Sequence, residues 1–240
     1  MIERQLWPPL RALWRRRERW NGRFLPLTLL AVLAAGGGLG YGSVARLCAE
    51  RGATLWSPWT IVDSRIPALP WTLWVYLAFH PWFVLTAFAA PRSERGRAEL
   101  ALLFQALFAV GIVSLACFAA LPCEVWVRSD PALRASSLAP LYELLHAADP
   151  PWNAWPSLHV SESLLCTLAL DRWFARGRAG RRAALWAAWT AIALSTLTTK
   201  QHFVFDVLTG AWVGAAAWRW FLRARLEALE AHYPRADAQS

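Results

Sequence analysis

Charged residues are scarce in this chain, and lysine is almost absent. Only 17% of the 240 residues are charged and 57% are hydrophobic, whereas a soluble domain has about 25% charged and about 45–50% apolar residues. Lys200 is the only lysine among 25 basic residues. This composition excludes a disordered chain and a large soluble core. It indicates an integral membrane protein.

Cysteine is also sparse. The four cysteines form no C-x-x-C pair, so neither a zinc site nor a redox motif is indicated. The sequence neither predicts nor excludes a disulfide bond between Cys48 and Cys123. The net charge of +9 does not predict nucleic-acid binding, because the arginines stand between long apolar runs and not on a polar face.

Long uncharged runs are typical of transmembrane helices. Four such runs are present, at residues 24–45, 66–91, 100–123 and 183–199. Two more segments, 156–174 and 203–222, are apolar but contain Glu162 and Asp206. Hydropathy alone does not decide whether these two segments cross the membrane.

The distribution of arginine favours six spans over four. Cytoplasmic loops collect Lys and Arg, and four spans would put the five arginines of residues 172–182 outside. With six spans, 19 of the 25 basic residues, Arg235 included, lie inside and 6 lie outside. We therefore predict an all-α polytopic protein of a bacterial inner or plasma membrane with both termini cytoplasmic.

This topology gives three parts. Residues 1–23 form a basic amphipathic cytoplasmic N-terminus, residues 24–222 form a six-helix membrane domain, and residues 223–240 form a cytoplasmic tail. No internal repeat or low-complexity linker indicates a further domain.

Ionisable side chains inside expected spans are functional candidates, because burying them in lipid is costly. His159 in the fourth span and His202 at the start of the sixth are expected within about one helical turn of the outer interface. His202 and Asp206 are four residues apart and share a helix face, where the carboxylate can accept the Nδ1 proton and leave Nε2 free. Gly210 and Gly214 continue this face, so a neighbouring helix can approach closely.

The residues around both histidines form two motifs. Residues 149–160 read D-P-P-W-N-A-W-P-S-L-H-V, and residues 195–210 read S-T-L-T-T-K-Q-H-F-V-F-D-V-L-T-G. They resemble the second and third signature motifs of the type 2 phosphatidic acid phosphatase superfamily. The P-S-L-H form is closest to the branch that includes inositol phosphorylceramide synthases and sphingomyelin synthases.

The resemblance implies a membrane phosphatase-like domain with its active site at the outer ends of spans four to six. It implies His202 as the nucleophile, Asp206 as the residue that orients it, and His159 as the general acid and base. It implies no metal and no cofactor. Ser157, the backbone at Leu158, and Ser195 are the expected phosphate-binding groups.

Two departures concern the basic residues. The family's first motif is absent, and Thr196 stands where the third motif usually has arginine. Lys200 and Arg128 are therefore candidates to bind phosphate, although Lys200 also fits a snorkelling helix-end residue and Arg128 a surface role. Possible substrate-contacting residues are Asn153, Glu162 and Arg134, and a helix-packing role for Glu162 stays open.

These features predict a lipid phosphatase that hydrolyses a phosphomonoester or pyrophosphate of a lipid through a phosphohistidine. Its partners would be the bilayer and a lipid phosphate such as a polyprenyl pyrophosphate or phosphatidate. An alternative is a phosphotransferase that moves a phospho-headgroup to a lipid or polyol alcohol. A second alternative is a non-enzymatic transporter or scaffold.

Overall fold

The computed structural model describes residues 2–52, 54 and 56–233. Within this part of the chain the structure is helical, with one isolated β-bridge between Cys123 and Asn153 and no β-strand. The all-α class is thereby confirmed. All four cysteines are free, so the bridge that the sequence left open is not formed. Arg235 and the rest of the tail beyond Tyr233 lie outside the described residues.

Helices occupy all six expected spans. Their bounds are α3 (Phe24–Arg51), α5 (Leu73–Leu77) with α6 (Phe79–Ala89), α7 (Glu94–Ala120), α10 (Leu158–Leu170), α11 (Ala179–Thr198) and α12 (Val204–Ala216). Two π-helical segments, η3 (Asp171–Ala175) and η4 (Ala217–Leu222), extend α10 and α12. The remaining helices are α1 (Ile2–Gln5), α2 (Pro8–Arg15), α4 (Ile61–Arg65), η1 (Pro70–Thr72), η2 (Trp126–Ser129), α8 (Pro131–Arg134), α9 (Ala139–Ala148) and α13 (Arg223–His232).

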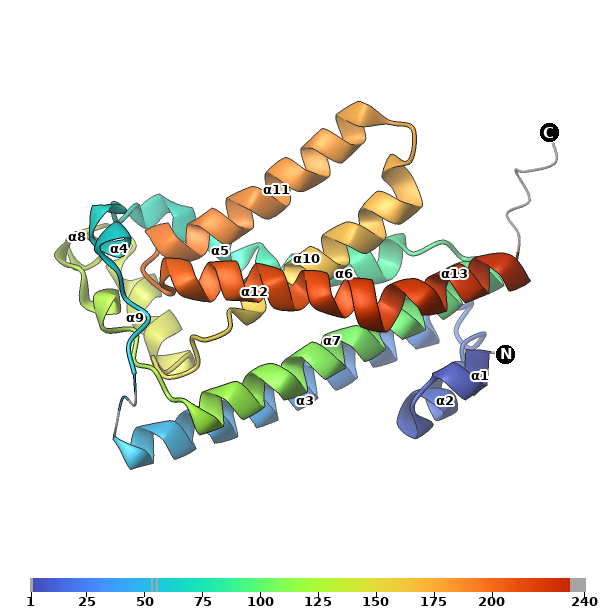
Figure 1. The fold of residues 1–240 in the computed structure, drawn as a ribbon, viewed down its shortest axis with the longest axis horizontal. Coiled ribbons are helices and arrows are strands. Elements are labelled where there is room, and N and C mark those ends of the chain that lie inside the picture. Colours follow the sequence, from blue (N-terminus) through green and yellow to red (C-terminus); the bar gives the residue numbers. More distant parts are fainter. Residues whose placement is uncertain (1, 53, 55, 234–240) are drawn as a thin grey trace.

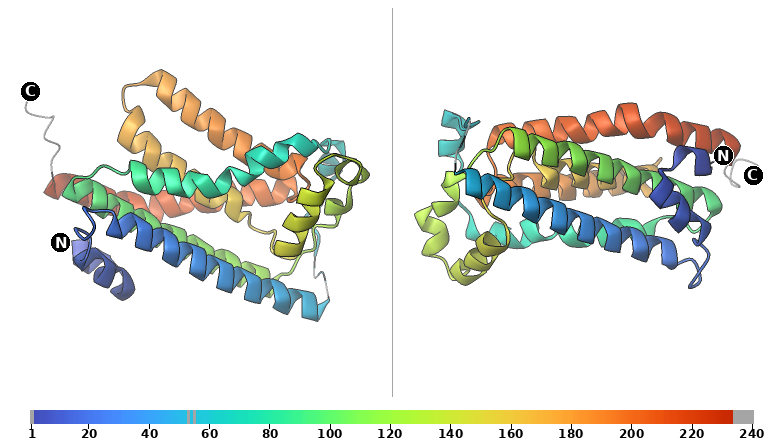
Figure 2. Two further views of the ribbon diagram at one scale, coloured as in Figure 1. Left: turned by 180° about the vertical axis from the view of Figure 1, so that it is seen from behind. Right: turned by 90° about the horizontal axis from the view of Figure 1, so that it is seen from below.

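Three helical stretches are long and apolar enough to cross a membrane. They are Phe24–Arg51, Pro70–Ala89 and Glu94–Ala120, which indicates a membrane protein. Figure 2 shows α3 and α7 side by side, and they pack against each other along their length. The crossing of α10, α11 and α12 stays a prediction.

The second span is interrupted near its middle. Helix α5 ends at Leu77 and α6 begins at Phe79. Pro81 explains the break, because it has no N–H to donate to the carbonyl of Leu77 and its ring crowds that carbonyl. The break places Tyr76 and Phe79 against α10, which packs on α6.

Helix α10 is the central helix and packs against α6, α7, α11 and α12. Nearly all its residues from Val160 to Leu170 are buried. Its hydroxyl side chains bond to carbonyls of the preceding turn, as Thr167 Oγ1 does to Ser163 O at 2.8 Å. Because its neighbours are helices and not lipid, the helix tolerates polar residues that lower its hydropathy.

The amphipathic N-terminal segment docks on the bundle. Leu10 and Trp14 of α2 are buried in the main hydrophobic core. The backbone N–H of Trp7 donates to Gln105 Oε1 of α7 at 2.7 Å, and Gln105 Nε2 donates to the carbonyl of Gln5 at 3.1 Å. The apolar face of this segment therefore packs on α7 and its neighbours.

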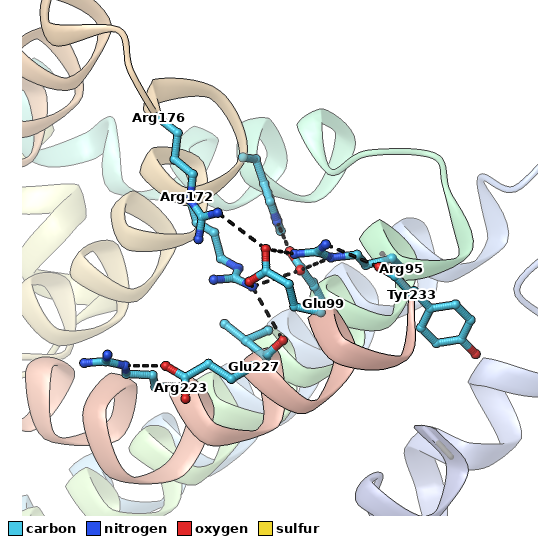
Figure 3. Close-up of polar contacts among 10 residues, drawn as sticks. Arg95, Glu99, Arg172, Arg176, Arg223, Glu227 and Tyr233 are labelled. Carbon is cyan, nitrogen blue, oxygen red and sulfur yellow. Dashed lines mark hydrogen bonds and ion pairs between the residues drawn. The ribbon is translucent and has the colours of Figure 1, made fainter. Parts of the chain in front are cut away.

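Helices α1 and α13 lie at one end of the molecule, and α4, α8 and α9 lie at the other (Figure 1). An ionic cluster joins α7, η3 and α13 at the first end (Figure 3). Glu99 accepts from Arg95 Nε at 2.9 Å, from Arg172 Nη2 at 3.4 Å and from Trp173 Nε1 at 2.7 Å. Glu230 of α13 bonds Arg95 and Arg172, each at 3.0 Å.

Burial opposes ionisation of Glu230, but the hydrogen bonds and charges of Arg95 and Arg172 prevail and lower its pKa from 4.5 to about 2. Because the folded pKa is the lower one, this contribution to stability is present above pH 4.5. It is lost as the pH falls toward 2.

We predict that Glu99→Gln destabilises the fold by about 3 kcal/mol, because it removes the charge that balances buried arginines. The measurement is unfolding in detergent micelles. The matched control is Glu227→Gln, whose pair with Arg223 spans 2.7 Å with both side chains more than half exposed, and which should change stability by less than about 1 kcal/mol. Equal losses in the two variants would contradict a structural role for the cluster.

Candidate functional site

A tight turn between α11 and α12 carries His202. The backbone N–H groups of Gln201 and His202 both donate to the carbonyl of Thr196, at 2.9 and 3.1 Å. Lys200 takes a left-handed conformation with φ of 59°, which reverses the chain within a few residues. His202 is thereby placed at the start of α12 and is 6% exposed.

Asp206 lies beside His202 at the predicted helical spacing. Its Oδ2 is 3.5 Å from His202 Nδ1 and accepts the N–H of Phe203 at 2.9 Å. Within the described residues, His202 Nδ1 has no closer hydrogen-bond partner. The two side chains therefore share one face, as the sequence predicts, at a separation that a small movement shortens to a hydrogen bond.

Ser157 connects the two motifs. Its Oγ is 3.2 Å from His202 Nε2, and its backbone N–H donates to the carbonyl of Asp206 at 3.2 Å. It is also the N-cap residue of α10, so the first N–H groups of that helix, at Leu158 and His159, begin next to His202.

His159 lies in the first turn of α10 with its ring against α5 and α6. The ring centroid is 4.3 Å from that of Tyr76, 4.2 Å from that of Phe79 and 5.8 Å from that of His202. Among the described residues, its Nε2 has no hydrogen-bond partner. Without such a partner, this nitrogen can donate or accept one further hydrogen bond.

Two glycines of α12 allow the close contact that assembles the site. A Cβ added to Gly210 would lie 2.6 Å from the carbonyl oxygen of Ser157, and one added to Gly214 would lie 2.7 Å from that of Ser161. Real side chains do not occupy such positions. The predicted close helix approach is therefore present, and α10 is the helix that uses it.

Two candidates around the third motif bond to carbonyl groups. Lys200 Nζ donates to the carbonyl of Ile66 at 2.6 Å and is 7% exposed. Ser195 Oγ donates to the carbonyl of Ile192 at 2.7 Å within its own helix. Each already has a partner, so a phosphate contact by either group stays a prediction.

Arg128 belongs to a buried network and not to the surface. Its Nη1 donates to the carbonyl of Asp149 at 2.5 Å, and its Nη2 lies 3.3 Å from Asp149 Oδ2. Tyr41 of α3 donates its hydroxyl to Asp149 Oδ1 at 2.6 Å, and Asn153 Nδ2 donates to the carbonyl of Tyr41 at 3.1 Å. This network ties the second-motif loop to α3.

Arg134 and Arg128 line a cavity of about 430 Å³ in the loop between α7 and α10. Other polar residues of its wall are Glu124, Ser129, Tyr142, Glu143 and His146. His146 Nε2 is 3.1 Å from the side-chain amide of Gln201, the residue before His202. Burial and the charge of Arg128 lower the pKa of His146, against the opposing effect of Asp149.

Glu162 is buried one turn after His159 and faces α7, where its Oε1 lies 3.7 Å from the position of a Cβ on Gly111. Across residues 2–52, 54 and 56–233, no group of three or more His, Cys, Asp or Glu side chains is arranged to hold a metal ion.

Tyr76 and Phe79 are contacts of His159 that sequence reasoning missed. A three-residue spacing would put them on one face of an unbroken helix, but the apolar run around them gives no sign of their partner. In the sequence, Asp149 is only the first residue of the second motif, and nothing there indicates a specific role for it. Its pairing with Arg128 depends on the fold of the loop between them.

A family model described as the PAP2 superfamily matches residues 56–220. The matched segment begins just before α4 and includes both motifs. No curated protein and no solved structure matches the chain significantly.

We predict that Gly210→Ala destabilises the protein by about 1–3 kcal/mol, because the new methyl group forces α10 and α12 apart. Unfolding in detergent micelles measures the change. Gly37→Ala is the matched control, since nothing lies within 4 Å of a Cβ at this helical position. It should be neutral or stabilising by up to about 1 kcal/mol. If both variants were equally stable, the close packing would not support the fold.

Proposed function

The chain belongs to the PAP2 superfamily, and from this premise we propose that it is a membrane lipid phosphatase that acts through a phosphohistidine. Superfamily members are generally phosphatases, which favours an enzyme over a transporter or scaffold. The proposed substrates are lipid phosphomonoesters or pyrophosphates, such as phosphatidate or a polyprenyl pyrophosphate.

One observation carries the proposal. His159 of α10 and His202 before α12 come from separate motifs, yet their ring centroids lie 5.8 Å apart and Ser157 Oγ lies 3.2 Å from His202 Nε2. If the histidines only packed the helices together, their rings would not need to lie this close to each other. A phosphoryl group between the two rings would have a nucleophile on one side and a proton donor on the other.

In the proposed reaction, His202 Nε2 attacks phosphorus while the bond from phosphorus to the lipid oxygen breaks. His159 gives a proton to the leaving oxygen, and Asp206 orients the Nδ1–H of His202. Water then gives a proton to His159 as its oxygen attacks phosphorus. The N–P bond breaks, phosphate leaves, and both histidines return to their starting states.

The phosphoryl oxygens need hydrogen-bond donors that take no part in the proton transfers of the reaction. The first N–H groups of α10, at Leu158 and His159, and the hydroxyl of Ser157 are suitable, because a helix N-terminus favours anions. Lys200 and Arg128 would add positive charge from positions fixed by the carbonyl of Ile66 and by Asp149.

We further propose that six helices cross the membrane and that the site faces the periplasm or exterior, with both termini in the cytoplasm. The bias of 19 basic residues toward one side supports this orientation. The start of α12 and helix α13 also lie toward opposite ends of the molecule (Figure 1). A lipid could then reach the histidines laterally at headgroup level.

We predict that His202→Ala lowers phosphate release from dioctanoyl phosphatidate or farnesyl pyrophosphate by at least about 10⁴-fold, because it removes the nucleophile. His159→Ala should lower it by about 10²–10⁴-fold. Purified protein in detergent, assayed for free phosphate, gives the measurement. With a ³²P-labelled substrate, wild type should also yield an acid-labile protein label that His202→Ala lacks.

His232→Ala is the matched control, since this exposed histidine ends α13 at the far end of the molecule and should leave phosphate release unchanged. The proposal would be wrong if wild type released no phosphate from these lipids, or if His202→Ala matched it.

A second candidate function is transfer of the phospho-headgroup to an alcohol. The cavity that contains Arg128, Arg134 and Glu143 favours it, because these polar groups suit a hydroxyl-rich acceptor and His146 connects the cavity wall to Gln201. An acceptor held there would take the place of water in the second step.

For this candidate we predict that a ³²P-labelled donor lipid gives a labelled lipid product when inositol or a lipid alcohol is added. Arg134→Ala should reduce that product more than it reduces free phosphate, since only the acceptor uses the cavity. Arg46→Ala, an exposed arginine of α3 outside the cavity, serves as the control. Release of phosphate alone under all conditions would exclude transfer to these acceptors.

A further inference from the structure

Asp63 of α4 contacts the start of α12, although 141 positions separate it from Val204. Its Oδ1 accepts the N–H of Val204 at 2.7 Å. Its Oδ2 accepts the backbone N–H and the hydroxyl of Thr60, at 2.7 and 2.8 Å. The side chain is 6% exposed, so both carboxylate oxygens have protein partners in a nearly buried setting.

The contact with Asp63 gives the N–H of Val204 a hydrogen-bond partner that α12 itself does not provide. The first N–H groups of a helix have no partner within that helix. Asp206 accepts the N–H of Phe203, and Asp63 accepts the next one, that of Val204. Two carboxylates therefore cap the start of α12, which begins two residues after His202.

Other contacts join the same two segments. The N–H of Leu69 donates to the carbonyl of Thr198 at 2.9 Å, and the hydroxyls of Thr72 and Thr198 are 2.8 Å apart. Lys200 Nζ donates to the carbonyl of Ile66 at 2.6 Å. Residues 60–72, which we term the clamp segment, thus hold the chain on both sides of His202.

Capping of α4 alone does not account for Asp63. Thr60 and Asp63 form a capping box, but that motif uses only Oδ2, and Oδ1 is left to Val204. Figure 1 shows α4 at the same end of the molecule as the start of α12. Asp63 is also the only acidic residue between Glu50 and Glu94. The T-x-x-D pattern was a signal by which the sequence could have identified it.

We propose that Asp63 is a positioning residue for the phosphoryl-transfer reaction, an inference that rests on the proposed function. By fixing the first turn of α12, it keeps the Asp206 carboxylate aligned with Nδ1 of His202, so that this nitrogen carries the proton and Nε2 is the nucleophile. Asp63 itself bonds Thr60 and Val204 and acts through α12.

The test compares Asp63→Ala and Asp63→Asn with wild type, using dioctanoyl phosphatidate as the probe. Asp63→Ala should lower kcat by about 10- to 100-fold, because small misplacements of reacting groups have effects of this size, while KM stays nearly constant. Asp63→Asn should restore part of kcat, since its amide oxygen can still accept the N–H of Val204. The control Asp130→Ala, which removes a carboxylate that caps α8 by accepting from Ala132, should leave kcat unchanged.

A second readout does not depend on turnover. In ¹⁵N-histidine NMR spectra, Asp63→Ala should lower the share of His202 protonated at Nδ1, and Asp130→Ala should not. If wild type hydrolysed no dioctanoyl phosphatidate, the proposed function would fail. The His202 spectrum would still support or overturn the positioning role of Asp63. The positioning role of Asp63 would be overturned if Asp63→Ala left both kcat and the His202 spectrum unchanged. It would also be overturned if Asp63→Ala lowered only the stability and its folded fraction kept the wild-type kcat and spectrum.

Discussion

Backbone contact between α10 and α12 is the constraint on which the rest of the site depends. Gly210 and Gly214 leave no room for a side chain against Ser157 and Ser161, so the two helices meet at a distance that only glycine permits. Their N-terminal ends therefore converge, and each end brings one histidine. The hydrogen bond from the Ser157 backbone to the carbonyl of Asp206 sets the relative height of the helices, and with it the separation of the imidazole rings.

Polar groups in an apolar bundle are stable only with partners, and the partners here make the site rigid. Asp206 and Asp63 share the start of α12, and Asp149 joins Arg128 to Tyr41. Two imidazole nitrogens at the centre, Nε2 of His159 and Nδ1 of His202, have no hydrogen-bond partner among the described residues. In the proposed reaction, such a fixed frame would help to stabilise the charge that develops at the phosphoryl group.

The basic residues near the histidines are held by protein groups. Lys200 is held by the carbonyl of Ile66, and Arg128 is held by Asp149, so both contribute to the frame around the histidines. Of Lys200, Arg128 and Arg134, only Arg134 is placed solely as a cavity-wall residue. In the proposed function, phosphate recognition would depend most on the first N–H groups of α10 and on Ser157, whose Oγ lies 3.2 Å from His202 Nε2.

The sequence by itself determined the helical class, the positions of the long helices, the face shared by His202 and Asp206, and the family, because periodicity and motif spacing are local properties of the chain. Predicted helix ends differ from the observed ones by a few residues, since caps such as Ser93 and breaks such as Pro81 depend on individual contacts. Only the tertiary structure decided that Tyr76 and Phe79 pack on His159 and that Arg128 is paired with Asp149. It also decided that Asp63 reaches Val204. These contacts join residues far apart in sequence, and helix packing, which the local pattern does not encode, sets their distances.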